Sequence, residues 1–152
     1  MAITIVKPED LKDYVGKDLG ATEWFKVDQD RINKFADATE DHQFIHVDSE
    51  KATPIFGSTI AHGFLSLSLV AGLGKDTALV VEGAKMGLNY GLDKVRFTNA
   101  TPSGSFYRGR LSLLEFNSNP SGAKYKLKVI IELKGQEKPA CIAEFLALAY
   151  NK

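Results

Sequence analysis

A segment near the middle of the chain has no polar face. Apart from His62, the side chains of Ala61–Gly74 are apolar or small on every side. Alternation of the leucines with Ser66 and Ser68 is also compatible with a strand, but the length of the segment and the Gly72-Leu73-Gly74 stop favour a helix. A helix without a polar face has to be covered by the rest of the domain. The segment therefore predicts a buried central helix.

Two helices and a strand are predicted before this segment. Lys7-Pro8-Glu9-Asp10 opens a short helix that ends at Gly16, because proline and acidic side chains suit a first helical turn. Asp28 is a good N-cap for a second helix, which runs to Ala38. Between these two helices, the apolar and aromatic residues of Ala21–Val27 indicate a strand.

After Asp76 the pattern changes to strands. In Tyr125–Leu133 the odd positions are apolar, which is typical of a half-buried antiparallel strand. Cys141–Tyr150 is apolar on both faces except at Glu144, which predicts a central strand covered on both sides. The architecture that follows is α+β, a long central helix wrapped by a curled antiparallel sheet, which is the hotdog fold. The expected strands are 78–81, 85–90, 95–98, 105–116, 125–133 and 141–150.

Length and composition narrow the class of protein. At 152 residues and 44% hydrophobic, the chain has material for one domain covering residues 1–152. Lys and Arg total 19 and so do Asp and Glu, so the chain lacks the net positive charge that favours binding to nucleic acid or to an anionic membrane. The single Cys141 rules out an internal disulfide. The sequence has no secretory signal pattern and no apolar run of membrane-spanning length, so we expect a soluble cytoplasmic protein.

A polar turn before the central segment collects acid-base side chains. Asp41 and His46 are close enough in sequence to hold one water molecule between them. Gly63 stands at the start of the predicted helix, where unpaired N–H groups can stabilise a developing negative charge. Taken singly, Asp41 is explained as a turn residue and His46 as a hydrogen-bonded buried imidazole. Taken together, they have the groups needed to add water to an activated double bond.

Two stretches of the chain resemble the MaoC-like dehydratase family, in its nodulation protein N-like branch. They are residues 35–48 and 56–65. The hydratase motif of the family runs Asp, any residue, Asn, Pro, an aliphatic residue, His, any residue, Asp. Asp41 and His46 match its first Asp and its His, whereas Gln43 replaces the Asn and the following Phe replaces the Pro. The match covers most of the chain.

The resemblance implies a function and a site. It implies (R)-specific hydration of trans-2-enoyl-CoA thioesters to (R)-3-hydroxyacyl-CoA, or the reverse dehydration, in a homodimer or a higher homo-oligomer. By this resemblance, Asp41 and His46 bind the hydrating water, and the N–H of Gly63 holds the thioester oxygen. Neither a metal nor a cofactor is expected. The residues expected to bind substrate are Gln43, His62, Asn89 and Tyr90.

Three other readings stay open. A hotdog protein can also be an acyl-CoA thioesterase, because one fold hosts several chemistries. Replacement of the motif's Asn and Pro is compatible with an acyl-thioester-binding protein that has lost catalysis. His42 and His46 have the spacing of a helical metal pair, although residues 44–47 are not expected to be helical.

Overall fold

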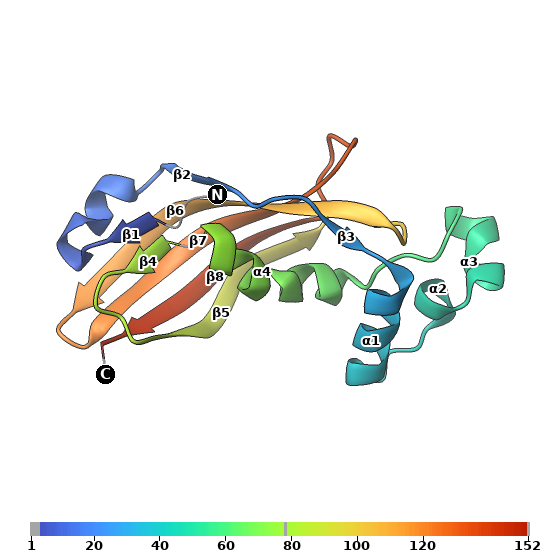
Figure 1. The fold of residues 1–152 in the computed structure, drawn as a ribbon, viewed down its shortest axis with the longest axis horizontal. Coiled ribbons are helices and arrows are strands. Elements are labelled where there is room, and N and C mark those ends of the chain that lie inside the picture. The colour runs from blue at the N-terminus through green and yellow to red at the C-terminus, as the bar shows by residue number, and fades with distance from the viewer. Residues whose placement is uncertain (1–3, 78, 152) are drawn as a thin grey trace.

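An antiparallel sheet forms the larger part of the molecule and ends before the lobe of helices α1 to α3 (Figure 1). The computed structural model describes residues 4–77 and 79–151. In this sheet the spatial order is β2-β6-β7-β8-β5, and β3 pairs with β6 beside β2. A separate short sheet joins β1 and β4 in parallel. The strands are β1 (Thr4–Val6), β2 (Asp18–Ala21), β3 (Phe25–Val27), β4 (Leu79–Val81), β5 (Met86–Phe97), β6 (Ser105–Asn119), β7 (Gly122–Leu133) and β8 (Cys141–Tyr150).

The helices divide into a central one and a group at one end. α4 (Gly63–Thr77) lies along one face of the sheet, and α1 to α3 form a lobe beyond the end at which α4 begins (Figure 1). Asp28 caps α1 as predicted, since its carboxylate accepts the backbone N–H of Arg31 at 3.0 Å. The remaining helices are the 3-10 helix η1 (Pro8–Tyr14), α1 (Gln29–Thr39), α2 (Phe44–Val47) and α3 (Ser49–Phe56).

The core lies between α4 and the sheet. Along β7 the residues Val129, Ile131 and Leu133 are buried, and the residues between them are less so. The alternation expected of a half-buried antiparallel strand is therefore confirmed. β8 is buried on the core face and half-buried on the other, so it is less completely covered than predicted. The predicted α+β hotdog architecture is confirmed by this helix-on-sheet arrangement.

Several predicted boundaries were wrong. The strands expected over residues 85–90 and 95–98 form one strand, β5. Its pairing with β8 continues through residues 91–94, with bulges at Tyr90 and Asp93. The strand expected over residues 21–27 is split between β2 and β3. α4 continues through the glycines at 72 and 74 to Thr77, since a glycine inside a helix costs only about 1 kcal/mol relative to alanine. Ala78, the first residue of the strand expected over residues 78–81, lies outside the described residues.

The central helix keeps one exposed stripe. Leu65 and Ser66 are buried as predicted. Phe64, however, is 66% exposed, and Ser68 and Gly72 on the same side of α4 are also exposed. Their spacing of four residues places them one above another on the helix surface. The prediction that the helix is wrapped on every side is therefore wrong for this single chain.

Among residues 4–77 and 79–151, no helix combines the length and the apolar character that crossing a bilayer requires.

Ile131→Ala is expected to destabilise the protein much more than Ile130→Ala. Ile131 is 0% exposed in the core cluster, whereas its neighbour Ile130 points to the other face of β7 and is only half-buried. Truncating a fully buried isoleucine costs about 2–5 kcal/mol, and we expect less than half of that loss for Ile130. Urea denaturation measures both free energies of unfolding. Equal losses would mean that the two faces of β7 are equally buried.

Candidate active site

The polar turn predicted to carry the acid-base pair begins where α1 ends. Glu40 closes α1 in the left-handed conformation, with φ of 62°, and this reverses the direction of the chain. The carboxylate of Asp41 then accepts the backbone N–H of Gln43 at 3.3 Å, which is a short Asx turn. Asp41 is thereby exposed at the edge of the lobe, with its carboxylate held by its own turn.

The next residues form a helical turn, contrary to the prediction. In α2 the backbone N–H of Asp48 donates to the carbonyl of Phe44 at 2.9 Å, and the N–H of His46 donates to the carbonyl of Gln43 at 3.0 Å. Asp48 also caps α3 through its carboxylate. Because a single turn joined directly to the next helix has no apolar periodicity of its own, the sequence pattern did not reveal it.

The ring of His46 is fixed by a backbone carbonyl. His46 is 7% exposed, and its Nδ1 lies 2.7 Å from the carbonyl oxygen of Ile60. A carbonyl only accepts, so Nδ1 carries the proton and Nε2 of the neutral ring keeps a lone pair. The same two segments are joined by the N–H of Ile60, which donates to the carbonyl of Ile45 at 2.9 Å. Nε2 is therefore the atom of His46 that can take a proton.

His62 lies against both members of the predicted pair. Its ring stacks on His46, with centroids 3.8 Å apart and planes 21° from parallel, and its Nε2–H donates to the backbone carbonyl of Asp41 at 3.0 Å. Burial lowers the pKa of His62. The hydrogen bond to Asp41 raises this pKa in part, and the proximity of His46 lowers it further. The neutral ring then has a lone pair on Nδ1. Among the described residues this buried atom has no hydrogen-bond partner.

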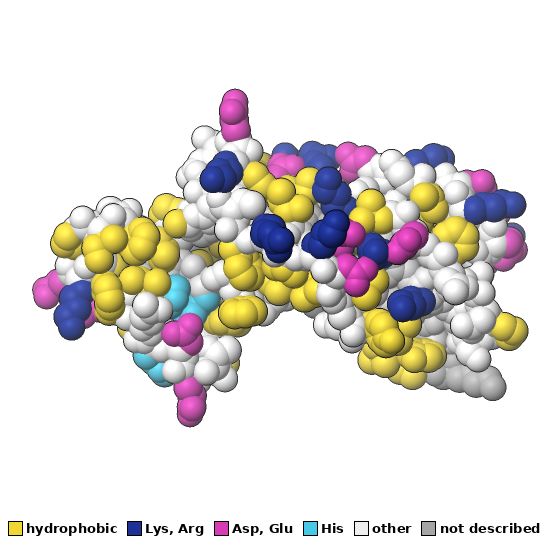
Figure 2. All heavy atoms as spheres, turned by 180° about the vertical axis from the view of Figure 1, so that it is seen from behind, with side chains coloured by type: hydrophobic (Ala, Val, Ile, Leu, Met, Phe, Trp, Pro, Cys, Tyr) yellow, Lys and Arg dark blue, Asp and Glu magenta, His cyan; other side chains and the backbone are white. Residues whose placement is uncertain are grey.

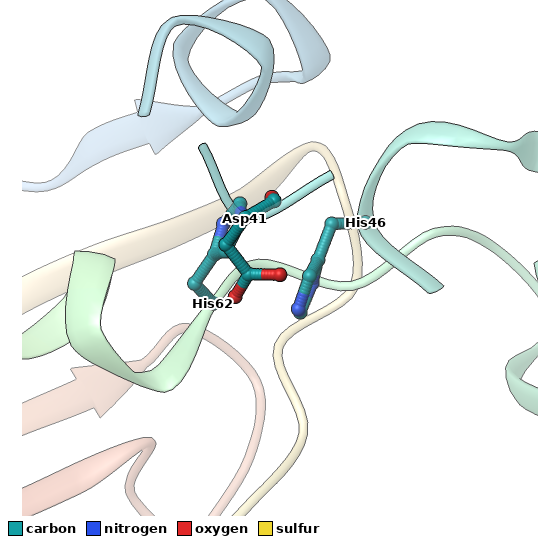
Figure 3. Close-up of side chains that lie close together, drawn as sticks. All are labelled: Asp41, His46 and His62. Atoms are coloured by element: carbon teal, nitrogen blue, oxygen red, sulfur yellow. The ribbon is translucent and has the colours of Figure 1, made fainter. Parts of the chain in front are cut away.

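Asp41, His46 and His62 form a compact cluster (Figure 3). One donor atom from each lies within 4.8 Å of the other two. A zinc ion needs its nitrogen ligands at about 2.0–2.1 Å. The lone pairs of two stacked rings lie in nearly parallel planes, with centroids 3.8 Å apart, so they do not converge on one ion at that distance. A water molecule bonds at about 2.8 Å and fits this spacing better than a metal ion.

The hypothesis of a helical metal pair is not supported by the position of His42. That residue precedes α2, and its exposed ring lies 2.9 Å from the carboxylate of Asp37. The hydrogen bond to Asp37 raises the pKa of His42. The structure thus brings His62, rather than His42, next to His46.

A cleft of about 360 Å³ opens beside the cluster, between the lobe and the end of the sheet. Figure 2 shows histidine atoms at this junction, beside apolar side chains. His46 and Gly63, two of the predicted catalytic residues, both line the cleft, and Asp41 lies next to His46. The other lining residues, which the sequence did not single out, are Ile45, Ile60, Ala61, Ser66, Phe97, Thr98, Asn99, Ala100, Thr101 and Ala140.

Gly63 begins α4 as predicted. The first N–H groups of α4 to find a partner are those of Leu65 and Ser66, which both donate to the carbonyl of His62, so the N–H of Gly63 has no partner within the helix. No backbone hydrogen bond from Gly63 to another described segment is formed either. A side chain at this position would meet the ring of Phe97, since an added Cβ would lie 2.9 Å from its Cγ. Glycine is required here because an aromatic ring packs against it.

Three predicted substrate-binding residues lie apart from the cleft. Gln43 is exposed at the start of α2 and is not among the residues that line the cleft. Asn89 and Tyr90 are on β5, where they border a separate groove of about 280 Å³. The groove also touches α4, through Leu67 and Ser68. The structure therefore unites Asp41, His46, His62 and Gly63 and leaves the other three outside this group.

The chain matches known proteins over most of its length. Residues 10–130 match the model of the MaoC like domain. The chain is 42% identical to nodulation protein N of Rhizobium leguminosarum bv. viciae, over 91% of this chain and 88% of that protein. It is also 42% identical to 3-hydroxyacyl-thioester dehydratase Z of Mycobacterium tuberculosis (strain ATCC 25618 / H37Rv), over 89% of this chain and 90% of that protein.

Solved structures agree on the fold. R-hydratase PhaJ1 from Pseudomonas aeruginosa superposes with a TM-score of 0.72 at 22% identity, over 91% of this chain and 83% of that one. The (R)-hydratase from A. caviae involved in PHA biosynthesis superposes with a TM-score of 0.71 at 21% identity, over 88% of this chain and 94% of that one. The resemblance found in the sequence is thus confirmed, and with it the prediction of a hydro-lyase. The chain belongs to the MaoC-like dehydratase family.

Proposed function

We propose that this protein adds water to trans-2-enoyl-CoA thioesters to give (R)-3-hydroxyacyl-CoA, or removes it in the reverse direction. One observation carries the proposal: a carboxylate and an imidazole with a free lone pair lie within 4.8 Å of each other, beside the cleft at which α4 begins. The name of the dehydratase from Mycobacterium tuberculosis, at 42% identity, supports a 3-hydroxyacyl thioester as the substrate class.

The reaction needs two proton transfers at one place. A water molecule between Asp41 and His46 donates to the carboxylate and to Nε2 of the imidazole. One of the two groups takes a proton as the oxygen attacks the β-carbon, and a proton is returned at the α-carbon. Positioned acid-base groups supply about 10²–10⁴-fold in rate. The unpartnered Nδ1 of His62 is a further acceptor for water at this cluster.

Negative charge appears on the thioester oxygen during the addition. The N–H of Gly63 is unpaired at the positive end of α4 and borders the same cleft as His46. In our proposal the thioester carbonyl accepts this N–H. An oxyanion donor of this kind supplies roughly 10²–10³-fold in rate.

The acyl chain follows the seam between α4 and β5. Ser66 borders the cleft and Leu67, the next residue, borders the groove that contains Asn89 and Tyr90. β5 borders both spaces as well, through Phe97 at the cleft and through Asn89 and Tyr90 at the groove. A chain that leaves the cleft along this seam would reach Asn89 and Tyr90, which supports their predicted role in binding. Gln43, exposed beside the site, stays a predicted contact for the thioester.

We also propose that a second copy covers β5. This strand is at the end of the sheet, where it pairs on one side only with the described residues, and Met86, Leu88 and Tyr90 are between 47% and 58% exposed. The exposed stripe of α4 that begins at Phe64 adds to this apolar surface. An unpaired edge and an apolar helix both need a cover in a stable protein, and a homodimer supplies it.

The proposed reaction is tested with crotonyl-CoA and the purified protein. Hydration removes the enoyl absorbance without releasing free thiol, whereas a thioesterase releases thiol. A non-catalytic thioester-binding protein does neither. If thiol is released at the same rate as the absorbance is lost, the protein is a thioesterase and the proposal of a hydratase is wrong.

Asp41→Asn and His46→Gln are each expected to lower turnover at least roughly a hundredfold, the loss typical of a positioned acid-base group. Both changes are nearly isosteric, so circular dichroism should show a folded protein. Asp37→Asn is the control, because Asp37 pairs with His42 outside the cluster. Near-native turnover in either of the first two variants would show that the pair is assigned wrongly.

Gly63→Ala is expected to lower turnover about ten- to a hundredfold, because displaced groups lose alignment with the substrate. The added Cβ pushes on Phe97, which forms the wall of the cleft. Phe97→Leu in the same background makes room and should restore part of the turnover. If Gly63→Ala alone leaves kcat unchanged, the cleft does not hold the reacting thioester.

Sedimentation equilibrium is expected to give the mass of a dimer. Leu88→Lys places a charge in the proposed interface and should shift the mass towards that of one chain. Ile5→Lys is the matched control, since Ile5 is 66% exposed on β1, which belongs to the separate short sheet. A wild-type protein of single-chain mass would contradict the proposal.

A further inference from the structure

A buried serine borders the cleft one turn after Gly63. Ser66 is 2% exposed, and it lines the cleft together with His46 and Gly63. Its neighbours in the core are apolar, so a hydroxyl here needs a hydrogen-bond partner. Ser68, two residues further along α4, is exposed and instead donates to the carbonyl of Phe64 in its own helix.

Ser66 shares a hydrogen bond with a buried tyrosine. Its Oγ lies 2.7 Å from the hydroxyl of Tyr107, which is 0% exposed. Burial raises the pKa of Tyr107, although the hydrogen bond with Ser66 opposes the shift. Tyr107 thus stays a neutral phenol that can both accept and donate a hydrogen bond.

Counting protons shows that this pair has one donor to spare. Two hydroxyl groups carry two protons, and the hydrogen bond between them uses one. If Tyr107 donates to Ser66, the proton of Ser66 is left over, and Ser66 lines the cleft. In this arrangement the fold presents one hydroxyl proton to the cleft.

We propose that Ser66 donates this proton to the thioester oxygen, as a second donor beside the N–H of Gly63. The inference rests on the proposed hydration of enoyl thioesters. In an α-helix each side chain leans towards the N-terminus and covers the turn before it. The hydroxyl of Ser66 accordingly lies over the turn that Gly63 opens. In this arrangement Tyr107 donates its own proton to Ser66.

Steady-state kinetics with crotonyl-CoA separates this role from a structural one. Ser66→Ala should lower kcat by about a hundredfold, at the lower end of the loss for one oxyanion donor, and should leave KM within a few-fold. Ser66→Thr keeps a hydroxyl and should stay within about tenfold of wild type. Ser112→Ala, on the same strand as Tyr107 but lining neither the cleft nor the groove, is the control and should keep full turnover. An unchanged kcat in Ser66→Ala overturns the proposal.

A spectroscopic measurement tests the contact directly. Crotonyl-CoA labelled with ¹³C at the thioester carbonyl is bound to Asp41→Asn, in which turnover is slow, and its carbonyl stretch is recorded by isotope-edited infrared spectroscopy before it reacts. Adding Ser66→Ala should move the band to higher wavenumber, because a donor to the oxygen has been removed. An unmoved band with a lowered kcat would mean that Ser66 acts only through packing, and would overturn the proposal.

A second hydroxyl-bearing residue at the cleft gives a further check. Thr101 also lines the cleft, and Thr101→Val should lower kcat less than Ser66→Ala does. A larger loss in Thr101→Val would make Thr101 the donor and contradict the assignment to Ser66. If wild-type protein does not hydrate crotonyl-CoA at all, it is the proposed function that fails; if it does and only the Ser66 results fail, the function stands.

Discussion

The absence of a polar face on α4 is the constraint on which the arrangement depends. Because a helix of this composition has to be covered, the sheet lies along it and presents buried residues such as Val129 and Ile131 to the same core. This packing also decides where α4 begins, at the end of the sheet that faces the lobe (Figure 1). The first N–H groups of the helix are therefore placed where the polar turn arrives. The position of the site follows from burying an apolar helix.

Backbone carbonyls give the two histidines of the site their tautomers. The carbonyl of Ile60 takes the Nδ1 proton of His46, and the carbonyl of Asp41 takes the Nε2 proton of His62. Each ring is left with one lone pair, and each bond also ties together segments that are distant in sequence. A side-chain partner could rotate away, whereas a carbonyl is held by its own chain. The tautomer that the proposed reaction needs is thus part of the fold itself.

Some of this could be predicted from the sequence and some could not. Local sequence patterns predicted the helix that begins at Gly63, the N-cap at Asp28 and the buried face of β7. Each of these predictions was correct to within a few residues. The helical turn at α2 and the long strand β5 depend on bonds to distant segments, for which no local pattern exists. In the site, Asp41 and His46 could be found because they are close in sequence. The proposed role of Ser66 depends on its hydrogen bond with Tyr107, which is 41 residues away in the sequence.

The stacking of His46 on His62 limits how many protons the site can hold. Two imidazolium rings 3.8 Å apart, both of them buried, would repel each other strongly. Burial also lowers the pKa of His62, which disfavours a positive charge on that ring. The stack therefore resists carrying two positive charges at once. The proposed hydration matches this limit, because each cycle withdraws a single proton from water and gives a single proton back.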